Sequence, residues 1–452
     1  MPTTIASSAI RQDSGVERTE RRAPSLRGIR FFVVATLLAA PLAFGAVQPW
    51  AWGLLALAAC VLLAWWAFEN VRHRAVRVAW SPLLILGIGF FLLGTAQLLG
   101  RASLDHEGTR EALIKLATDL IFFFVVSQIV AESGLPPSKA HLGFDSLGPG
   151  IAIYSFSVAM FAILQFFSSH GLIYWRVQTD GWTFGPYVNH NHYAGLMEML
   201  IPLAAAYAFS RPRNHPGKSF FLLGSVVAAA SVLLSGSRGG FVALAAEALI
   251  LGLMLWRWAP GLRWRQAVAA GLLSVSAVAV LCFWLDPGRI SRRLVSVAGL
   301  THSPEVTLGQ RWIVARDTLR LFGEHPWFGT GLGSFKLAFP QVQSFATDLV
   351  YHHAHNDYVE ALAETGLAGG ALILTGLLIF FGISLRNVRS GLLNGEGWIR
   401  VGAFLGCTGL LVHSLVDFNL HIPANALWFA VLAAVATTHT ANRDVDFSAG
   451  RS

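Results

Sequence analysis

The sequence is poor in charged residues, and this shortage decides the class of protein. Only 13% of the 452 residues are Asp, Glu, Lys or Arg, whereas 54% are hydrophobic. A soluble domain carries about 25% charged residues. A chain with half that share lacks the polar side chains to cover a surface in water, so lipid must cover much of it.

Cysteine is scarce too. The three cysteines, Cys60, Cys282 and Cys407, each lie in an apolar run, so they form neither a disulfide framework nor a metal-binding spacing. The net charge of +8 is not gathered into one basic patch, because the arginines fall in short clusters between apolar runs. We therefore expect a lipid bilayer and no nucleic acid among the partners.

Apolar runs long enough to cross about 30 Å of hydrocarbon as helices recur along the chain. They predict an all-α polytopic membrane protein with about twelve transmembrane helices. The expected spans are 31–47, 50–69, 81–99, 111–131, 148–167, 192–209, 219–236, 240–257, 267–285, 366–385, 398–416 and 422–438.

Lys and Arg predict the orientation, because cytoplasmic loops carry an excess of them. They cluster in the segments 70–80, 210–218, 257–266 and 386–400, all of which fall on one side of the membrane. The short alternating segments, 47–50, 100–110, 168–191, 237–239 and 417–421, hold only Arg101, Arg110, Arg176 and Arg238. We therefore expect a bacterial inner-membrane protein with both termini in the cytoplasm and one long loop in the periplasm. The Arg21-Arg22 pair also fits a twin-arginine export signal, but the many spans that follow favour a cytoplasmic tail.

These predictions divide the chain into five segments. We expect a disordered cytoplasmic tail, a first membrane domain with spans one to nine, a periplasmic loop, a second membrane domain with spans ten to twelve, and a short cytoplasmic tail. The segments are 1–30, 31–285, 286–356, 357–438 and 439–452.

Two polar motifs lie at span ends on the predicted outer face. Asn189, Asn191 and His192 open the sixth span, where they either bind a ligand or cap and anchor the helix. Arg238 lies in a tight turn of Ser and Gly residues whose backbone N–H groups can bind an anion at a helix start. Its guanidinium adds a planar fork of donors that suits phosphate. An interfacial anchor is the alternative role for Arg238.

The predicted outer loop contributes Arg311 and a glycine-rich segment from His325 to Phe335. The spaced glycines are a weak match to a phosphate loop, since no strand precedes them and ATP is not available outside the membrane. A glycine-rich turn is the better interpretation. Arg311 is either a second anion ligand or an ordinary charge on an amphipathic helix.

The sharpest motif surrounds His355. Asp357 and Glu360 have the spacing of a capping box that opens a helix, and Gly366 is expected to break that helix. His355 then lies just before a helix amino terminus, whose dipole favours the neutral imidazole that can accept a proton. Asn356 can fix its orientation.

A metal site is the alternative for this motif, because His352, His353 and His355 fall within four residues. The His-Glu-x-x-His pattern is missing, and this spacing on a loop is not a recognised ligand set. We therefore assign no metal. Farther along, Asp417 places a carboxylate at the outer end of the eleventh span, either as a functional residue or as part of the interface.

Together these motifs resemble the superfamily of O-antigen ligases and polymerases. The resemblance covers residues 183–370, and the span layout fits the rest. It is carried by Asn189-His-Asn191-His192-Tyr-Ala-Gly, Ser235-Gly-Ser-Arg238-Gly-Gly, Arg311, His325-Pro-Trp-Phe-Gly-Thr-Gly-Leu-Gly-Ser-Phe and His355-Asn-Asp-Tyr-Val-Glu-Ala-Leu-Ala-Glu-Thr-Gly-Leu.

The resemblance implies a GT-C-like fold and a glycosyltransferase. Such an enzyme moves a glycan from undecaprenyl diphosphate to an acceptor hydroxyl at the periplasmic face, without metal, nucleotide or other cofactor. Arg238 and Arg311 are similar to its diphosphate-binding arginines, and His355 to its catalytic histidine. Asp417 matches its acidic residue by position more than by motif. We expect further substrate contacts from Asn189, Asn191, His192 and Asn356.

Several functions remain open. Ligases, polymerases and enzymes that glycosylate proteins share these motifs, and their acceptors are a lipid A core sugar, a growing polysaccharide or a Ser/Thr side chain. A transporter or flippase of lipid-linked sugar is the rival from another class. Transporters place polar or broken helices near the bilayer midplane, whereas the expected spans are clean inside and their polar clusters lie at one face. A metal-dependent membrane hydrolase would need the histidines to bind zinc.

Overall fold

The computed structural model describes residues 26–74, 76, 78–132, 147–179, 181–212, 214–258, 308–347, 349–394 and 397–438. Within these ranges the regular secondary structure is helical, apart from two isolated β-bridges, Ile173–Val177 and Phe184–Tyr187. The prediction of an all-α fold is thereby confirmed for these residues. The expected span at 267–285, the part of the predicted loop before residue 308, most of the amino-terminal tail and the carboxy-terminal tail lie outside them.

Eight helices of the described chain are long and apolar enough to cross a bilayer. They are α2 (Pro49–Arg72), α3 (Pro82–Leu99), α4 (His106–Glu132), α5 (Gly148–Ser168), α6 (His190–Ser210), α7 (Lys218–Ser235), α8 (Arg238–Trp258) and α13 (Asp357–Asn394). Two apolar helices are shorter, α14 (Trp398–His413) and α15 (Pro423–Thr437), and α1 (Arg27–Leu42) contains Pro41. The chain is therefore a polytopic membrane protein, and the number of about twelve spans stays a prediction.

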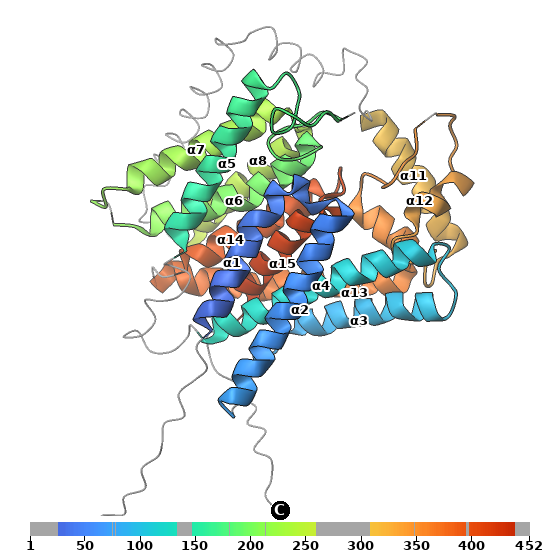
Figure 1. Cartoon of the computed structure of the whole chain (residues 1–452), viewed down its shortest axis with the longest axis horizontal. Coiled ribbons are helices and arrows are strands. Elements are labelled where there is room, and N and C mark those ends of the chain that lie inside the picture. Colours follow the sequence, from blue (N-terminus) through green and yellow to red (C-terminus); the bar gives the residue numbers. More distant parts are fainter. Residues whose placement is uncertain are drawn as a thin grey trace, which may run out of the picture.

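Helix α6 is mostly buried and packs against α5, α7 and α14, and α5, α6 and α7 lie together at the left of Figure 1. Its crossing with α14 is close because α14 presents glycines there. A Cβ atom at Gly402 would lie 2.8 Å from Leu203 Cα, and one at Gly406 would lie 2.8 Å from Met199 Cα. Small residues that allow such close backbone approach are typical of helix contacts within membranes.

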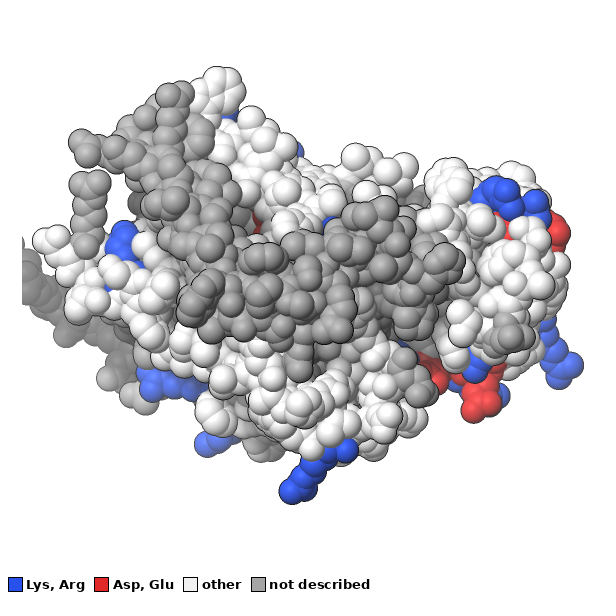
Figure 2. All heavy atoms as spheres, turned by 90° about the horizontal axis from the view of Figure 1, so that it is seen from above, with Lys and Arg blue, Asp and Glu red and all other residues white. Residues whose placement is uncertain are grey.

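Several connections between the helices meet at one end of the bundle, which we call the loop end. Tyr187, before α6, donates to Asn425 Oδ1 of α15 over 2.7 Å, and Leu104, between α3 and α4, donates to the Thr330 carbonyl over 2.9 Å. The segment 308–350 lies here, at the right of Figure 1. Figure 2 shows charged side chains gathered at this side, and Lys and Arg side chains at the left and along the lower edge.

The segment 308–354 has a small core of its own. It contains α11 (Leu308–Glu324), α12 (Phe335–Ala338) and the 3₁₀ turn η4 (Phe339–Gln341). The buried side chains of this core are Val314, Leu321, Phe335, Ala338, Phe339, Val342, Tyr351 and Ala354, joined by Ala363 of α13. The segment therefore forms a compact cap on the loop end.

The glycine-rich segment is a turn that packs against α13, as the sequence predicts. Gly329, Gly331 and Gly333 all have positive φ, of 71°, 113° and 75°, and any larger residue would be strained there. The Glu364 carboxylate accepts hydrogen bonds from Gly333 N and Phe335 N, each over 2.9 Å. Helix α13 is interrupted at Gly366, which has a φ of 63°, so the predicted break is also confirmed.

Candidate functional site

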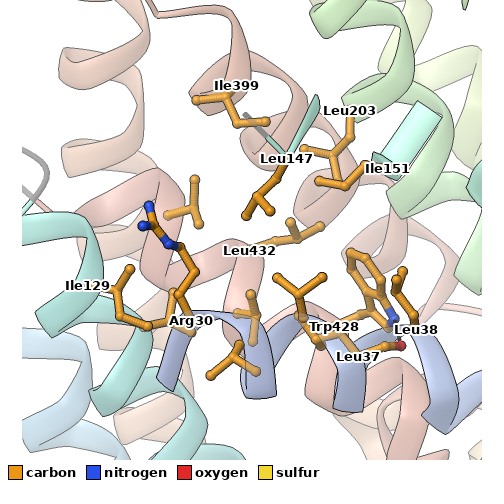
Figure 3. A pocket seen from close by; sticks show the side chains of 15 residues that line it. Arg30, Leu37, Leu38, Ile129, Leu147, Ile151, Leu203, Ile399, Trp428 and Leu432 are labelled. Carbon is orange, nitrogen blue, oxygen red and sulfur yellow. Dashed lines mark hydrogen bonds between the residues drawn. The ribbon is translucent and has the colours of Figure 1, made fainter. Parts of the chain in front are cut away.

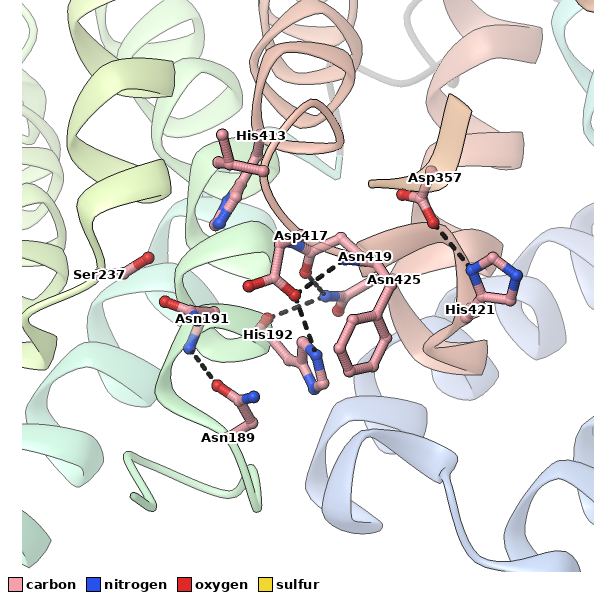
Figure 4. A network of polar contacts seen from close by, with 12 residues as sticks. Asn189, Asn191, His192, Ser237, Asp357, His413, Asp417, Asn419, His421 and Asn425 are labelled. Atoms are coloured by element: carbon pink, nitrogen blue, oxygen red, sulfur yellow. Dashed lines mark hydrogen bonds and ion pairs between the residues drawn. The ribbon is translucent and has the colours of Figure 1, made fainter. Parts of the chain in front are cut away.

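A buried polar cluster occupies the loop end, where α6, α11, α13 and the turn between α14 and α15 meet (Figure 4). Arg311 joins the cap to this turn. Its NH1 donates to the Val416 carbonyl over 2.5 Å and to Asp417 Oδ2 over 3.1 Å. Because Asp417 is 0% exposed, the pair lies where the desolvation of both charges must be offset by their mutual attraction.

Asp417 also faces His192 of α6, as Figure 4 shows. His192 Nε2 lies 3.6 Å from Asp417 Oδ1, which is an ion-pair distance but too long for a hydrogen bond. Burial alone would raise the pKa of Asp417, but Arg311, with a further contribution from His192, holds it well below its usual value. Asp417 is therefore a carboxylate, and it brings together two residues that the sequence placed in separate motifs.

His355 lies in the loop before α13, as predicted, and its backbone is strained. Its φ of 53° is in the left-handed region, which non-glycine residues seldom adopt outside special sites. Burial, with a smaller effect of Arg311 opposed by Asp417, lowers the pKa of His355 to about 4. The imidazole is therefore neutral at pH 7, and its buried Nδ1 has no hydrogen-bond partner among the described residues.

The start of α13 is capped differently from the prediction. Asn356 Oδ1 accepts hydrogen bonds from Tyr358 N over 3.1 Å and Val359 N over 3.0 Å, and Asn356 Nδ2 donates to the Leu415 carbonyl over 2.8 Å. The expected capping box of Asp357 and Glu360 is wrong, because both carboxylates turn toward other partners. Asn356 thus anchors the loop that carries His355, and its expected contact with substrate stays a prediction.

Phe418 was missed by sequence reasoning, although it follows Asp417 directly. Its ring contacts three imidazoles, with centroids 4.8 Å from His192, 4.4 Å from His353 and 5.0 Å from His355. An apolar ring excludes water from its neighbours, and such burial lowers the pKa of His353 and His355. The only signal in the sequence was its position between a carboxylate and His421.

Arg238 is the first residue of α8, at the end of the turn that the sequence singled out. Gly236 has a φ of 76°, and Ser237 Oγ accepts a hydrogen bond from Gly240 N over 3.1 Å. The His413 ring lies directly against Gly239. Since His413 lies four residues before Asp417, the Arg238 turn is at the same end of the bundle as the Arg311 pair.

The other residues of the first motif are used within the fold. Asn189 caps α6, because its Oδ1 accepts a hydrogen bond from Asn191 N over 2.8 Å. Asn191 is 5% exposed and His192 is 7% exposed. The capping reading is therefore confirmed for Asn189, while ligand contacts by these residues stay predictions.

The described spans contain buried ionisable residues, contrary to the expectation that their polar residues lie only at one face. Glu198 lies within α6, where its Oε1 is 2.8 Å from His413 Nδ1 and both side chains are fully buried. Glu247 lies within α8 and is 5% exposed. Ionisable residues inside spans mark functional sites by default. These two residues therefore support the alternative function of a transporter.

The histidines of the motif are divided between different surroundings. His352 is exposed, and His355 lies beside Phe418. His353, Glu360 and His421 place one potential metal ligand each within 4.8 Å of one another. The trio suggested by the sequence, His352, His353 and His355, is therefore not the group that the structure brings together.

An apolar pocket lies elsewhere, between α1, α4, α5, α6, α14 and α15 (Figure 3). Its lining is aliphatic apart from Trp428 and the side chain of Arg30. Such a lining offers no group for proton transfer, so the polar cluster at the loop end is the better candidate for chemistry.

These features define the class as a polytopic α-helical membrane protein with an ion-paired, histidine-rich site at one end of its bundle. Residues 223–374 match the family model described as O-antigen ligase, which confirms the resemblance to that superfamily for this third of the chain. The matched segment contains Arg238, Arg311 and His355, whereas His192 and Asp417 lie outside it. No curated protein matches the sequence. The family match and the helical membrane fold together support a membrane enzyme that processes glycans.

Proposed function

We propose that the protein transfers a glycan from undecaprenyl diphosphate to an acceptor hydroxyl at the periplasmic face of the bacterial inner membrane. The observation that carries this proposal is the neutral, strained His355 within electrostatic range of the Arg311–Asp417 pair. A base and a cation in one site are the two groups that displacement of a diphosphate requires.

In this mechanism Arg238 and Arg311 bind the donor diphosphate, and Asp417 holds the Arg311 guanidinium in place. His355 accepts the proton of the acceptor hydroxyl while the acceptor oxygen forms a bond to the anomeric carbon. The bond from that carbon to the diphosphate oxygen breaks, and undecaprenyl diphosphate leaves with the electron pair. A single displacement inverts the configuration of the sugar.

The bound donor also tunes the base. A pKa of about 4 makes His355 neutral but weakly basic, and general bases work best with a pKa near the operating pH. A diphosphate brings negative charge into the site, which raises the pKa of a nearby imidazole. Donor binding therefore prepares His355 to take a proton, and no metal is needed for the step.

The acceptor defines the subclass. A ligase uses a sugar of the lipid A core, and a polymerase uses the growing glycan itself. We propose the ligase reaction first, with the polymerase of an O-antigen or exopolysaccharide as the alternative. Incubating purified protein with a lipid-linked glycan and each acceptor in turn tests this choice, because only the true acceptor gains mass.

Transport of lipid-linked sugar is a second candidate, favoured by the buried Glu198–His413 pair and Glu247 inside the spans. A transfer assay in detergent separates the two candidates, since a transporter has no compartments to connect there. Covalent product formed in detergent supports the enzyme. Movement of donor across liposomes without product supports the transporter.

A further inference from the structure

A second group of ionisable side chains, in which two buried carboxylates meet two half-buried imidazoles, lies beside His355 and has no role in the mechanism above. It contains His353 from the loop, Asp357 and Glu360 from the first turn of α13, and His421 from the 3₁₀ turn η5 (Asn419–His421). The group therefore connects two segments that are far apart in the sequence, residues 353–360 and η5. Figure 4 shows Asp357 and His421 facing one another.

His421 bridges the two carboxylates. Its Nδ1 lies 2.8 Å from Asp357 Oδ1, and its Nε2 lies 3.2 Å from Glu360 Oε1. Burial alone would lower the pKa of His421, but Glu360 and Asp357 raise it to about 10. The ring is therefore an imidazolium at neutral pH, and both of its nitrogens donate.

Glu360 in turn holds the two residues that precede His355. Its Oε2 accepts a hydrogen bond from Ala354 N over 2.6 Å, and its Oε1 lies 2.8 Å from His353 Nδ1. Burial and the neighbouring His421 lower the pKa of His353 well below its usual value, so His353 is neutral and its Nδ1–H donates. Both oxygens of Glu360 thereby restrain the backbone that leads into His355.

This restraint explains how His355 keeps its backbone conformation. A left-handed φ in a non-glycine residue costs free energy, and it persists only where the surroundings enforce it. Asn356 fixes the chain on the other side of His355 through the cap of α13. The Glu360 carboxylate needs a nearby cation to stay buried and charged, and His421 is that cation.

We infer that His421 is a positioning residue for His355, acting through Glu360 and the Ala354 amide. The catalytic role of His355 in this inference rests on the proposed function. The restraint of its backbone does not depend on that function. Two measurements therefore test it, one of which is independent of activity.

The first measurement is hydrogen exchange of the segment 350–357 in wild type, His421→Gln and Glu360→Gln. Loss of either residue is expected to speed exchange in this segment, because the hydrogen bond of Ala354 N loses either its carboxylate acceptor or the imidazolium that holds that carboxylate in place. Exchange across α11 should not change. His352→Gln is the matched control, since His352 is exposed and outside the group. Unchanged exchange in His421→Gln would overturn the inference.

The second measurement is transfer kinetics. Because displacement of a reacting group by about 1 Å costs on the order of 10²-fold in rate, His421→Gln should lower kcat by about that factor and leave the KM for donor unchanged. The double variant His421→Gln/Glu360→Gln should be no slower than the slower single variant, since both act on one restraint. A raised KM with normal kcat, or multiplied losses in the double variant, would contradict it.

The result separates the two proposals. If wild type makes no product, the proposed function fails, and hydrogen exchange still decides the restraint. The same atoms could also ligate a transition metal, so metal content is measured on purified wild type. One equivalent of metal that is lost in His421→Gln would overturn the inference, and a metal-free protein with the exchange pattern above supports it.

Discussion

Arg311 and Asp417 are 106 residues apart in the sequence, yet they form an ion pair of 3.1 Å that joins the cap to the membrane domain. The Asp417 side chain is fully buried, and that of Arg311 is 17% exposed. The pair places a fixed positive charge beside a neutral histidine. The pair therefore affects both the stability of the fold and the transfer reaction, and suitable variants separate these two effects.

Removal of one partner should destabilise the protein. Asp417→Ala leaves the partly buried Arg311 without its carboxylate, and loss of one partner costs about 3–5 kcal/mol in buried pairs. Thermal unfolding in detergent should show a lower Tm. The double variant Arg311→Met/Asp417→Leu should recover most of the Tm but no transfer, because the diphosphate ligand is gone. Arg320→Ala is the control on the same helix, since Arg320 is 53% exposed. A double variant that transfers normally would remove Arg311 from the mechanism.

Arg238 should be essential for donor binding in the transition state. Arg238→Lys keeps the charge but loses the bidentate fork, so it should retain only part of the activity. Arg238→Ala should lose about 10²-fold or more in kcat/KM, as expected for removal of one transition-state donor. Arg101→Ala is the matched control, because Arg101 is exposed at the same end of the bundle. A folded, membrane-inserted Arg238→Ala protein with full activity would exclude the phosphate role.

The depressed pKa of His355 predicts how stability depends on pH. The unfolded chain binds a proton at His355 below pH about 6.5, whereas the folded protein resists it until about 4. Stability is therefore complete above 6.5 and falls as the pH drops from 6.5 toward 4. The Tm of wild type should fall more steeply over this range than that of His355→Gln. Parallel Tm curves for the two proteins would show that the pKa of His355 is not lowered.

The orientation of the bundle is testable independently of chemistry. Reporter fusions after Arg213 and Arg389 should read as cytoplasmic, because these segments carry the Arg and Lys clusters. Fusions near Ser303 should read as periplasmic. A cytoplasmic signal at Ser303 would reverse the membrane orientation and move the whole candidate site to the other face.

Much of the architecture was predictable because hydrophobic runs and charge clusters are local signals. The helices found at the predicted spans begin and end within about five residues of them, apart from α13, which extends nine residues beyond the predicted span at each end. The alternation of the Lys and Arg clusters also predicts that Arg311, His355 and Asp417 lie at one face of the bundle. Their meeting at the loop end follows from that topology.

The partners of individual side chains were not predictable, because they depend on packing between distant segments. The spacing of Asp357 and Glu360 fits a capping box, yet His421 and Ala354 N compete for these carboxylates and Asn356 takes the cap. Glu198 lies in an apolar run whose pattern gives no sign of His413, a residue 215 positions away. Phe418 gains its importance only from the three histidines around it.

The most direct test of the account is transfer from a lipid-linked glycan by His355→Ala and His352→Ala proteins, each with and without EDTA. His352 is the clean control because it is exposed, whereas His353 is bound to Glu360. We predict that His355→Ala loses about 10²–10⁴-fold in rate while still binding donor, that His352→Ala transfers normally, and that EDTA changes neither result. Normal transfer by His355→Ala, or wild-type activity that collapses with EDTA, would contradict the assignment of His355 as a metal-independent general base.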